Sequence, residues 1–190
     1  MVTWLAFLAL VGCERLLELG VSARNARAAR DRGAVESGAG HFGPMAGLHA
    51  AFLVACAVEV LLLDRPFPGA IGWVALAVVF LAQALRWWAV LSLGPRWNVR
   101  VIVVPGEEPV RRGPYRYLRH PNYLAVAVEI AALPLVHGAF ITALAFSVLN
   151  AAVLRVRIRA EERALGPGWE AAFAGVPRLW PFSGQGRRGG

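Results

Sequence analysis

Long apolar runs separated by arginine-rich segments form the dominant pattern of this chain. We expect five helices, at residues 1–21, 43–63, 69–93, 121–133 and 139–159. About 20 apolar residues let a helix cross the hydrocarbon core of a membrane, and the run at 43–63 holds only His49 and Glu59 as ionisable residues. The run at 121–133 gives only about 20 Å of helix at 1.5 Å per residue, so whether it spans fully stays open. The pattern therefore predicts an all-α integral membrane protein with about five transmembrane helices.

Arginines gather in alternate connections between the predicted helices. Four lie in the segment after the first helix, six in the segment after the third, and seven from Arg155 to the end, whereas the other two connections hold Arg65 alone. Connections rich in basic residues stay on the cytoplasmic side of a membrane. Five spans with an outside N-terminus place all three arginine-rich segments in the cytoplasm, so a pocket built from their polar residues would face the cytoplasm.

Composition agrees with a membrane location and narrows the classes of function. The chain of 190 residues is 57% hydrophobic and 17% charged, with a mean hydropathy of +0.52, whereas soluble domains carry about 25% charged residues. All 20 basic residues are arginine, which indicates a GC-rich coding bias, and no basic stripe interleaved with aromatics predicts nucleic-acid binding. Cys13 and Cys56 lie in apolar runs without disulfide or metal-ligand spacing. We expect one membrane-embedded domain over 1–182, a disordered tail at 183–190, and no metal or nucleic-acid partner.

Several ionisable residues lie inside the predicted spans. Glu14 and Glu18 are four residues apart and share a helix face. Charged groups within a membrane usually face the protein interior and pair there. We therefore expect Glu14 and Glu18 to form internal ion pairs with Arg15 or Arg86, although a direct role in a site is the alternative. His49 stands alone in its helix, which is typical of a satisfied core residue rather than a ligand.

The connections contain few regular elements. We expect a polar loop at 24–43, whose residues 38–43 match the pattern G-x-G-x-x-G but lack the strand before it and the βαβ unit that a dinucleotide site needs. In the second basic loop, 94–119, the β-branched run at 99–104 precedes a Pro-Gly turn at 105–108. This order predicts a small extended hairpin.

The stretch Gly113–Tyr123 concentrates aromatic, arginine and histidine side chains where a basic loop meets an apolar run. Pro121 suits the first position of a helix, and His120 before it can act as the cap. Farther along, Arg157 and Glu161 are four residues apart and share a face of the last predicted helix. A solvated helix end with local ion pairs would explain that spacing. The alternative is a cation and a carboxylate that point into a pocket at the membrane surface.

Two ordered motifs resemble the isoprenylcysteine carboxyl methyltransferase family, which belongs to a wider group of membrane methyltransferases. They are Gly113-Pro114-Tyr115 with Arg119-His120-Pro121-Asn122-Tyr123, and then, after a helical hairpin, Arg157-x-x-x-Glu161-Glu162. The resemblance covers roughly residues 70–180. It implies a multi-span enzyme that uses S-adenosylmethionine in an active site at the cytosolic face. One departure is Ala125, where the family usually has glycine two residues after the motif tyrosine.

The resemblance also implies roles for individual residues. Catalytic roles fall to Arg157, Glu161 and His120, and Arg157 and Arg100 would face the substrate. The residues expected to contact the cofactor are Pro109, Val110, Tyr115, His120, Pro121, Asn122, Tyr123 and Glu161. For His120 two roles stay open: a general base, or a hydrogen bond to the cofactor combined with helix capping.

Two further segments point to a substrate. The segments at 14–18 and 96–100 resemble a bacterial subgroup associated with type III polyketide synthases, whose members methylate alkylresorcinol or alkylpyrone lipids. We therefore expect an O-methyltransferase of a long-chain phenolic or pyrone lipid in a bacterial cytoplasmic membrane, with a functional link to a type III polyketide synthase. The alternatives are carboxyl methylation of an isoprenylated cysteine, phospholipid N-methylation, a nicotinamide-dependent membrane reductase and a non-enzymatic small membrane protein. A transporter would show internal repeats, and none is visible.

Overall fold

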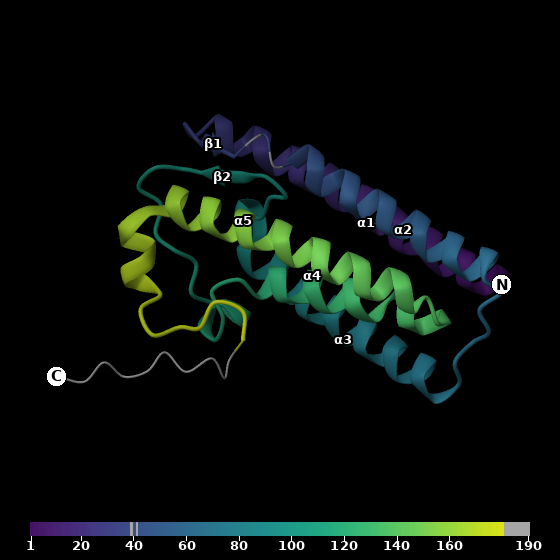
Figure 1. Ribbon diagram of the computed structural model, residues 1–190. Coiled ribbons are helices and arrows are strands. Elements are labelled where there is room, and N and C mark those ends of the chain that lie inside the picture. The colour runs from purple at the N-terminus through teal and green to yellow at the C-terminus, as the bar shows by residue number, and fades with distance from the viewer. Residues whose placement is uncertain (39, 41, 181–190) are drawn as a thin grey trace.

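Five long or medium helices lie lengthwise beside one another in the computed structural model, which describes residues 1–38, 40 and 42–180 (Figure 1). They are α1 (Val2–Arg30), α2 (Phe42–Leu62), α3 (Ala70–Leu93), α4 (Pro121–Ala132) and α5 (Phe140–Ala172). All five predicted helices are confirmed, and the boundaries of α2, α3 and α4 agree with the prediction to within one residue. The tail predicted at 183–190 lies outside the described residues.

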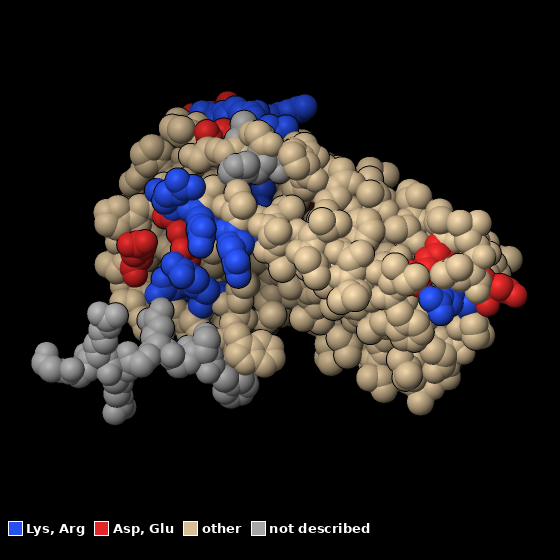
Figure 2. Space-filling view, in the orientation of Figure 1, with Lys and Arg blue, Asp and Glu red and all other residues tan. Residues whose placement is uncertain are grey.

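Three of these helices, α2, α3 and α5, are long and apolar enough to cross a membrane. The polar groups Glu14, Arg15 and Glu18 interrupt α1, and α4 is shorter than a span. On the face shown in Figure 2, charged side chains gather at the two ends of the molecule and leave an uncharged band between them. An all-α membrane protein is thus confirmed, and the five-span topology stays a prediction.

The segment after the first span differs from the predicted polar loop. The helix α1 continues to Arg30 instead of ending near Val21. Residues 22–30 consist mainly of alanine and arginine, which are strong helix formers, and no glycine follows Gly20 until Gly33. This extension is also packed, because Ser22, Asn25, Ala26 and Ala29 are buried.

A two-stranded antiparallel sheet replaces the predicted hairpin. The strand β1 (Val35–Ser37) pairs with β2 (Val101–Val103) in the register Val35 with Val103. The predicted turn exists, with Gly106 at φ 81° and a hydrogen bond from Glu107 N to Val104 O. The hairpin prediction was wrong because the partner strand comes from the connection after α1, and no local sequence signal marks such a distant pairing.

Short 3-10 helices complete the connections: η2 (Gly94–Arg96), η3 (Gly113–Arg116) and η4 (Pro134–His137). The last helix is kinked at Gly166, which has φ 75° and ψ −176° before Pro167. The helix continues past the predicted end at Arg159, because residues 160–165 (AEERAL) are good helix formers.

Glu59 of α2 caps the start of α5 from a distance. Its two carboxylate oxygens accept hydrogen bonds from the backbone N–H of Thr142, at 2.7 Å, and of Ile141, at 3.2 Å. Arg65 also donates to Glu59, at 3.3 Å. The N-cap residue Ala139 has no side-chain acceptor, so Glu59 satisfies amide groups that a helix start otherwise leaves unpaired.

We expect Glu59→Ala to destabilise the protein by about 1–2 kcal/mol, the usual cost of a lost cap. Thermal unfolding of the detergent-solubilised protein measures the change. Asp64→Asn, at an exposed position in the following turn, is the matched control and should leave the unfolding temperature unchanged. Equal unfolding temperatures for Glu59→Ala and wild type would show that the cap contributes nothing.

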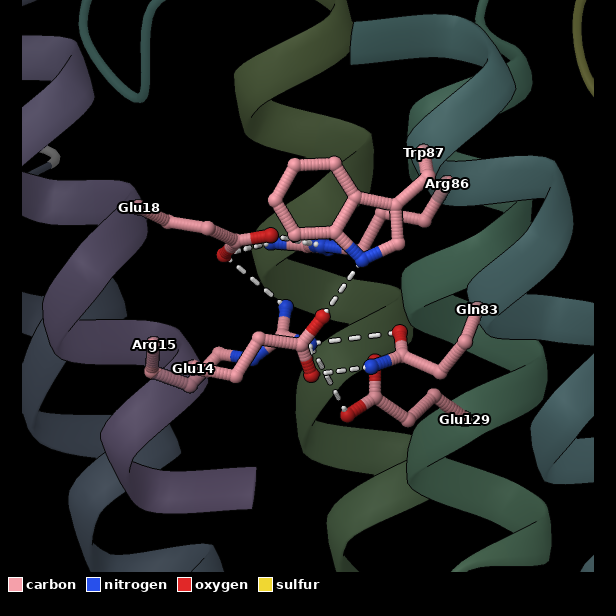
Figure 3. Close-up of polar contacts among 7 residues, drawn as sticks. All are labelled: Glu14, Arg15, Glu18, Gln83, Arg86, Trp87 and Glu129. Carbon is pink, nitrogen blue, oxygen red and sulfur yellow. Dashed lines mark hydrogen bonds and ion pairs between the residues drawn. The ribbon is translucent and has the colours of Figure 1, made fainter. Parts of the chain in front are cut away.

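A cluster of polar side chains centred on the buried Glu18, Arg86 and Glu129 lies between α1, α3 and α4 (Figure 3). Here the buried ionic cluster means Glu14, Arg15, Glu18, Gln83, Arg86, Trp87 and Glu129. Arg86 donates to both carboxylate oxygens of Glu18 at 2.5 Å, and Arg15 bridges Glu14 and Glu18 at 3.0 Å. The predicted pairing is confirmed, and Glu129 of α4 joins it through Arg15 at 3.6 Å.

Candidate functional site

A cavity of about 1230 Å³ lies at the end of the helices where the β1–β2 sheet and the arginine-rich segments meet. Its walls come from α1, α2, the segment at 93–110, the start of α4 and the second half of α5. The predicted site residues that line it are Arg100, Pro109, Val110, Tyr115, His120, Asn122, Tyr123, Arg157 and Glu161. Pro121 does not line it, because it is the buried first residue of α4. The structure thus brings together residues from segments that are far apart in the sequence.

Arg157, Tyr123 and Glu161 form one hydrogen-bonded group in the wall of the cavity. The Tyr123 hydroxyl donates to Glu161 Oε2, and Arg157 Nε donates to the same hydroxyl at 2.9 Å. A second nitrogen of Arg157 donates to the backbone oxygen of Val99. Arg157 is only 4% exposed, so the guanidinium is held in place by α4 and by the loop before β2. The spacing of four residues on α5 explains why Arg157 and Glu161 reach the same tyrosine.

His120 is placed by a carboxylate that the sequence interpretation did not single out. It occupies the predicted N-cap position of α4, although its side chain makes no capping hydrogen bond. Instead, Nε2 lies 3.1 Å from Glu162 Oε1, and Glu162 also accepts two hydrogen bonds from Arg178 at 2.8 Å. The bond to Glu162 raises the pKa of Arg178. The pairing could have been suspected from the Glu161-Glu162 doublet, because neighbouring helical residues point in different directions.

Tyr115 lies in the same wall and is positioned by a glycine. At Gly113, with φ 57°, an added Cβ would come within 2.0 Å of Ser92 Oγ, so only glycine lets this turn approach α3 so closely. Burial raises the pKa of Tyr115, and the nearby Glu161 adds to the effect. Tyr115 therefore remains a neutral phenol. The rings of Trp169 and Phe173 complete an aromatic wall.

Arg100 lines the cavity but is tied to the small sheet. Its Nη1 donates to Glu36 of β1 at 2.8 Å, and its guanidinium lies over the Phe42 ring at 4.5 Å from the centroid. The hydrogen bond from Arg100 lowers the pKa of Glu36. The predicted substrate contact stays a prediction. The backbone neighbour of Arg100, Val99, is held by Arg157 of α5, so Arg100 lies in the part of the wall that the sheet forms beside α5.

The loop before β2 is pinned to the C-terminal part of α1, a link that sequence interpretation missed. Asn25 Nδ2 donates to Trp97 O at 2.8 Å. The Ser22 hydroxyl donates to Asn98 Oδ1 at 2.6 Å and accepts from Val99 N at 3.1 Å. The backbone oxygen of Val99 also accepts a hydrogen bond from Arg157, so this loop connects α1 with α5.

The residues present fit a polar, positively charged cofactor. Asn122 Oδ1 and Trp97 Nε1 are buried and have no hydrogen-bond partner within the part of the chain that the structure describes. Both residues line the cavity, as do Tyr115, Tyr123 and Trp169. A ligand with donors, acceptors and a cationic centre would satisfy the unpaired atoms and contact the aromatic faces. In the described residues, no three His, Cys, Asp or Glu side chains are arranged to hold a metal ion.

The cavity also extends along α1 and α2 into the apolar part of the molecule. Its lining includes α1 from Ala9 to Leu19 and α2 from Phe42 to Leu53. Ten residues of helix correspond to about 15 Å, or half of a hydrocarbon core of about 30 Å. Leu16 is 67% exposed, and the small residue Ala50 is also exposed. This apolar arm, defined by these stretches of α1 and α2, is open toward the side of the molecule.

Comparisons with known proteins agree with the motifs. Residues 73–167 match the isoprenylcysteine carboxyl methyltransferase family. The uncharacterized protein YpbQ of Bacillus subtilis is 40% identical over 163 residues, which cover 85% of this chain and 95% of that protein. An uncharacterized protein of Haemophilus influenzae is 29% identical over 152 residues, which cover 80% of this chain and 88% of the relative.

Proposed function

This chain belongs to the isoprenylcysteine carboxyl methyltransferase family, and we propose that it is an S-adenosylmethionine-dependent O-methyltransferase of a lipid. The observation that carries the proposal is the shape of the large cavity. One end holds Arg157, Tyr123 and Glu161, and the other end is the apolar arm along α1 and α2. A water-soluble cofactor and a membrane-dissolved acceptor can both reach such a cavity. The arginine counts support a site that faces the cytoplasm of a bacterium.

S-adenosylmethionine, when bound, supplies a methyl group on a positively charged sulfonium. Tyr115, Tyr123 and Trp169 border the space for it, and each aromatic face attracts a cation by about 0.5–2 kcal/mol. Asn122 Oδ1 offers an unused acceptor, and Glu161 offers negative charge. With Pro109 and Val110 these residues would hold the cofactor. Pro121 would contribute by starting α4 rather than by contact.

The remaining residues act on the acceptor oxygen. Arg157 stays charged and is desolvated, so it can stabilise the negative charge left on an oxygen that loses its proton. His120 Nε2 carries its proton toward Glu162, because a carboxylate only accepts. In the neutral ring this leaves Nδ1 as an acceptor for the proton of the substrate hydroxyl. A fixed histidine and a fixed arginine would align the acceptor, and alignment contributes much of the rate in such displacements.

A long-chain phenolic or pyrone lipid suits these groups. The apolar arm provides room for an alkyl chain, and a guanidinium favours an oxygen that becomes negative over an ammonium group. Phospholipid N-methylation is therefore less suited to this site, while carboxyl methylation of an isoprenylated cysteine is the alternative. Because type III polyketide synthases make alkylated phenols and pyrones, we propose that such an enzyme supplies the substrate.

Membranes that contain the protein should transfer label from methyl-labelled S-adenosylmethionine to a long-chain phenol or pyrone. The test uses a panel that also contains phosphatidylethanolamine and an isoprenylated cysteine, with membranes lacking the protein as control. Absence of both transfer and cofactor binding would refute the methyltransferase proposal. Transfer only to phosphatidylethanolamine or only to the isoprenylated cysteine would refute the proposed substrate class.

A further inference from the structure

Four polar side chains line the cavity at the level of the apolar arm. They are Arg15, Glu18, Arg86 and His49, from three different helices. Three of them belong to the buried ionic cluster (Figure 3), so the cluster forms part of the cavity wall. Charged groups at membrane depth are costly and usually mark a functional pathway or site. A cluster that only joined helices would not need to border a cavity.

Some guanidinium N–H groups of the cluster have no hydrogen-bond partner in the described residues. Glu18 is fully occupied, since both of its oxygens accept from Arg86 and one also accepts from Arg15. Arg86 Nη1 and Arg15 Nε are buried without a hydrogen-bond partner in the described residues. Arg86 as a whole is only 5% exposed. Buried guanidinium donors of this kind favour a ligand that brings an acceptor oxygen.

The charge of the cluster limits what that ligand can be. The cluster contains three carboxylates, Glu14, Glu18 and Glu129, and two guanidiniums, Arg15 and Arg86, within the described residues. An anionic ligand would add to an existing excess of negative charge in a medium where unpaired charge is expensive. The unused donors therefore suit an uncharged oxygen.

His49 of α2 adds an acceptor to the same part of the cavity. Its Nδ1 lies 2.9 Å from Met45 O, and a carbonyl oxygen can only accept, so Nδ1 carries the proton. The neutral ring then leaves Nε2 as an acceptor. His49 and Arg15 also border a second, small void of about 10 Å³, close to the space of one water molecule. Guanidinium donors and an imidazole acceptor together match a hydroxyl group, which both accepts and donates.

We propose that the membrane-side part of the cavity, between Arg15, Arg86 and His49, binds an uncharged hydroxyl group of the lipid substrate. This inference rests on the proposed function, because the lipid is the same one that presents its methyl-accepting oxygen to Arg157. Ser22 on α1 binds the backbone of Val99, which in turn accepts a hydrogen bond from Arg157. Glu18 lies four residues before Ser22, so the cluster is about 6 Å farther along α1 from this point. The hydroxyl bound by Arg15, Arg86 and His49 therefore lies on the membrane side of the oxygen that receives the methyl group. In the lipid it would be on the ring or on the first carbons of the alkyl chain.

The test compares alkylphenols of equal chain length. One has no second oxygen, a series carries one hydroxyl on the ring or on successive proximal chain carbons, and one carries a carboxylate there. Both equilibrium binding to the solubilised protein and methyl transfer are measured. We expect at least one hydroxylated lipid to bind about 10–100-fold more tightly than the plain alkylphenol, the size of a hydrogen bond to a charged group. The carboxylate should bind no better than the plain lipid.

Two variants assign the effect to this site. Arg86→Lys keeps a positive charge beside Glu18 but removes the unpartnered Nη1, and His49→Leu removes the acceptor without touching the ion pairs. Each should bring the binding ratio of the two lipids close to one. The matched control is Trp87→Phe, which removes a hydrogen bond to Glu14 in the same cluster and should keep the ratio.

The outcomes separate this inference from the proposed function. If all the lipids bind equally tightly and all are methylated, the hydroxyl site is refuted and the methyltransferase proposal is not affected. A binding preference without any transfer would support the site and count against the proposed reaction. If neither Arg86→Lys nor His49→Leu changes the preference of the folded protein, the hydroxyl is bound elsewhere and the proposal is wrong.

Discussion

Replacing Arg157 with alanine is expected to lower kcat for methyl transfer by about 100–1000-fold, the usual cost of losing a preorganised group that stabilises an oxyanion. The side chain is 4% exposed and is fixed by the Tyr123 hydroxyl and by Val99 O. A guanidinium held so firmly loses little by reorganising when charge develops on a nearby oxygen. The measurement is methyl transfer at saturating lipid and cofactor, together with cofactor binding.

The neighbouring carboxylate, Glu161, should affect cofactor binding as well as the rate of methyl transfer. Glu161→Ala removes the acceptor for Tyr123 and the negative charge beside Tyr115, so we expect cofactor binding to weaken along with the rate. Arg157→Lys should recover little, because an ammonium group cannot bond the tyrosine and the backbone oxygen in the same planar arrangement. Arg155→Ala, at an exposed position two residues earlier on α5, is the control and should retain full activity. Full activity of Arg157→Ala and Glu161→Ala would show that the site lies elsewhere.

The starts of the five helices and the ends of α2, α3 and α4 were predictable because their signals are local. Pro121 and the apolar run at 43–63 each act within a few residues of themselves, whereas α1 and α5 continue past their predicted ends. The convergence of Tyr123 and Glu161 followed from two short motifs with a hairpin between them. Local patterns were therefore confirmed at the level of the helices, whereas the roles of the residues that line the cavity stay predictions.

Contacts between distant segments could not be predicted in the same way. Val35 pairs with Val103, and Asn25 holds Trp97, but neither pair carries a spacing signal in a single sequence. Glu162 was named only as part of a motif and given no role, because helix geometry alone does not show that Arg178 folds back over it. The buried ionic cluster was anticipated as pairs, but its third carboxylate on α4 required the packing of three helices.

The second large effect concerns that cluster. Glu18→Ala should destabilise the protein by about 3–5 kcal/mol, because it leaves the buried guanidinium of Arg86 without its partner. Because arginine does not lose its proton in proteins, the cost of a buried and unpaired positive charge remains. Reversible unfolding in detergent, by heat or denaturant, measures the loss. Glu14→Gln is the matched control, since Arg15 still has Glu18 and Glu129 and the excess of negative charge is removed.

The reverse variant should be milder. Arg86→Met leaves Glu18 with Arg15, and a carboxylate can take up a proton when its environment disfavours charge. We therefore expect Arg86→Met to cost less than Glu18→Ala, and the double variant Glu18→Leu with Arg86→Met to regain most of the stability, as buried ion pairs replaced by apolar groups often do. Equal costs for the two single variants would contradict the argument from the unpaired guanidinium. A stable double variant that loses its preference for hydroxylated lipids would show that these charges serve recognition more than stability, because Arg86 and Glu18 both line the cavity.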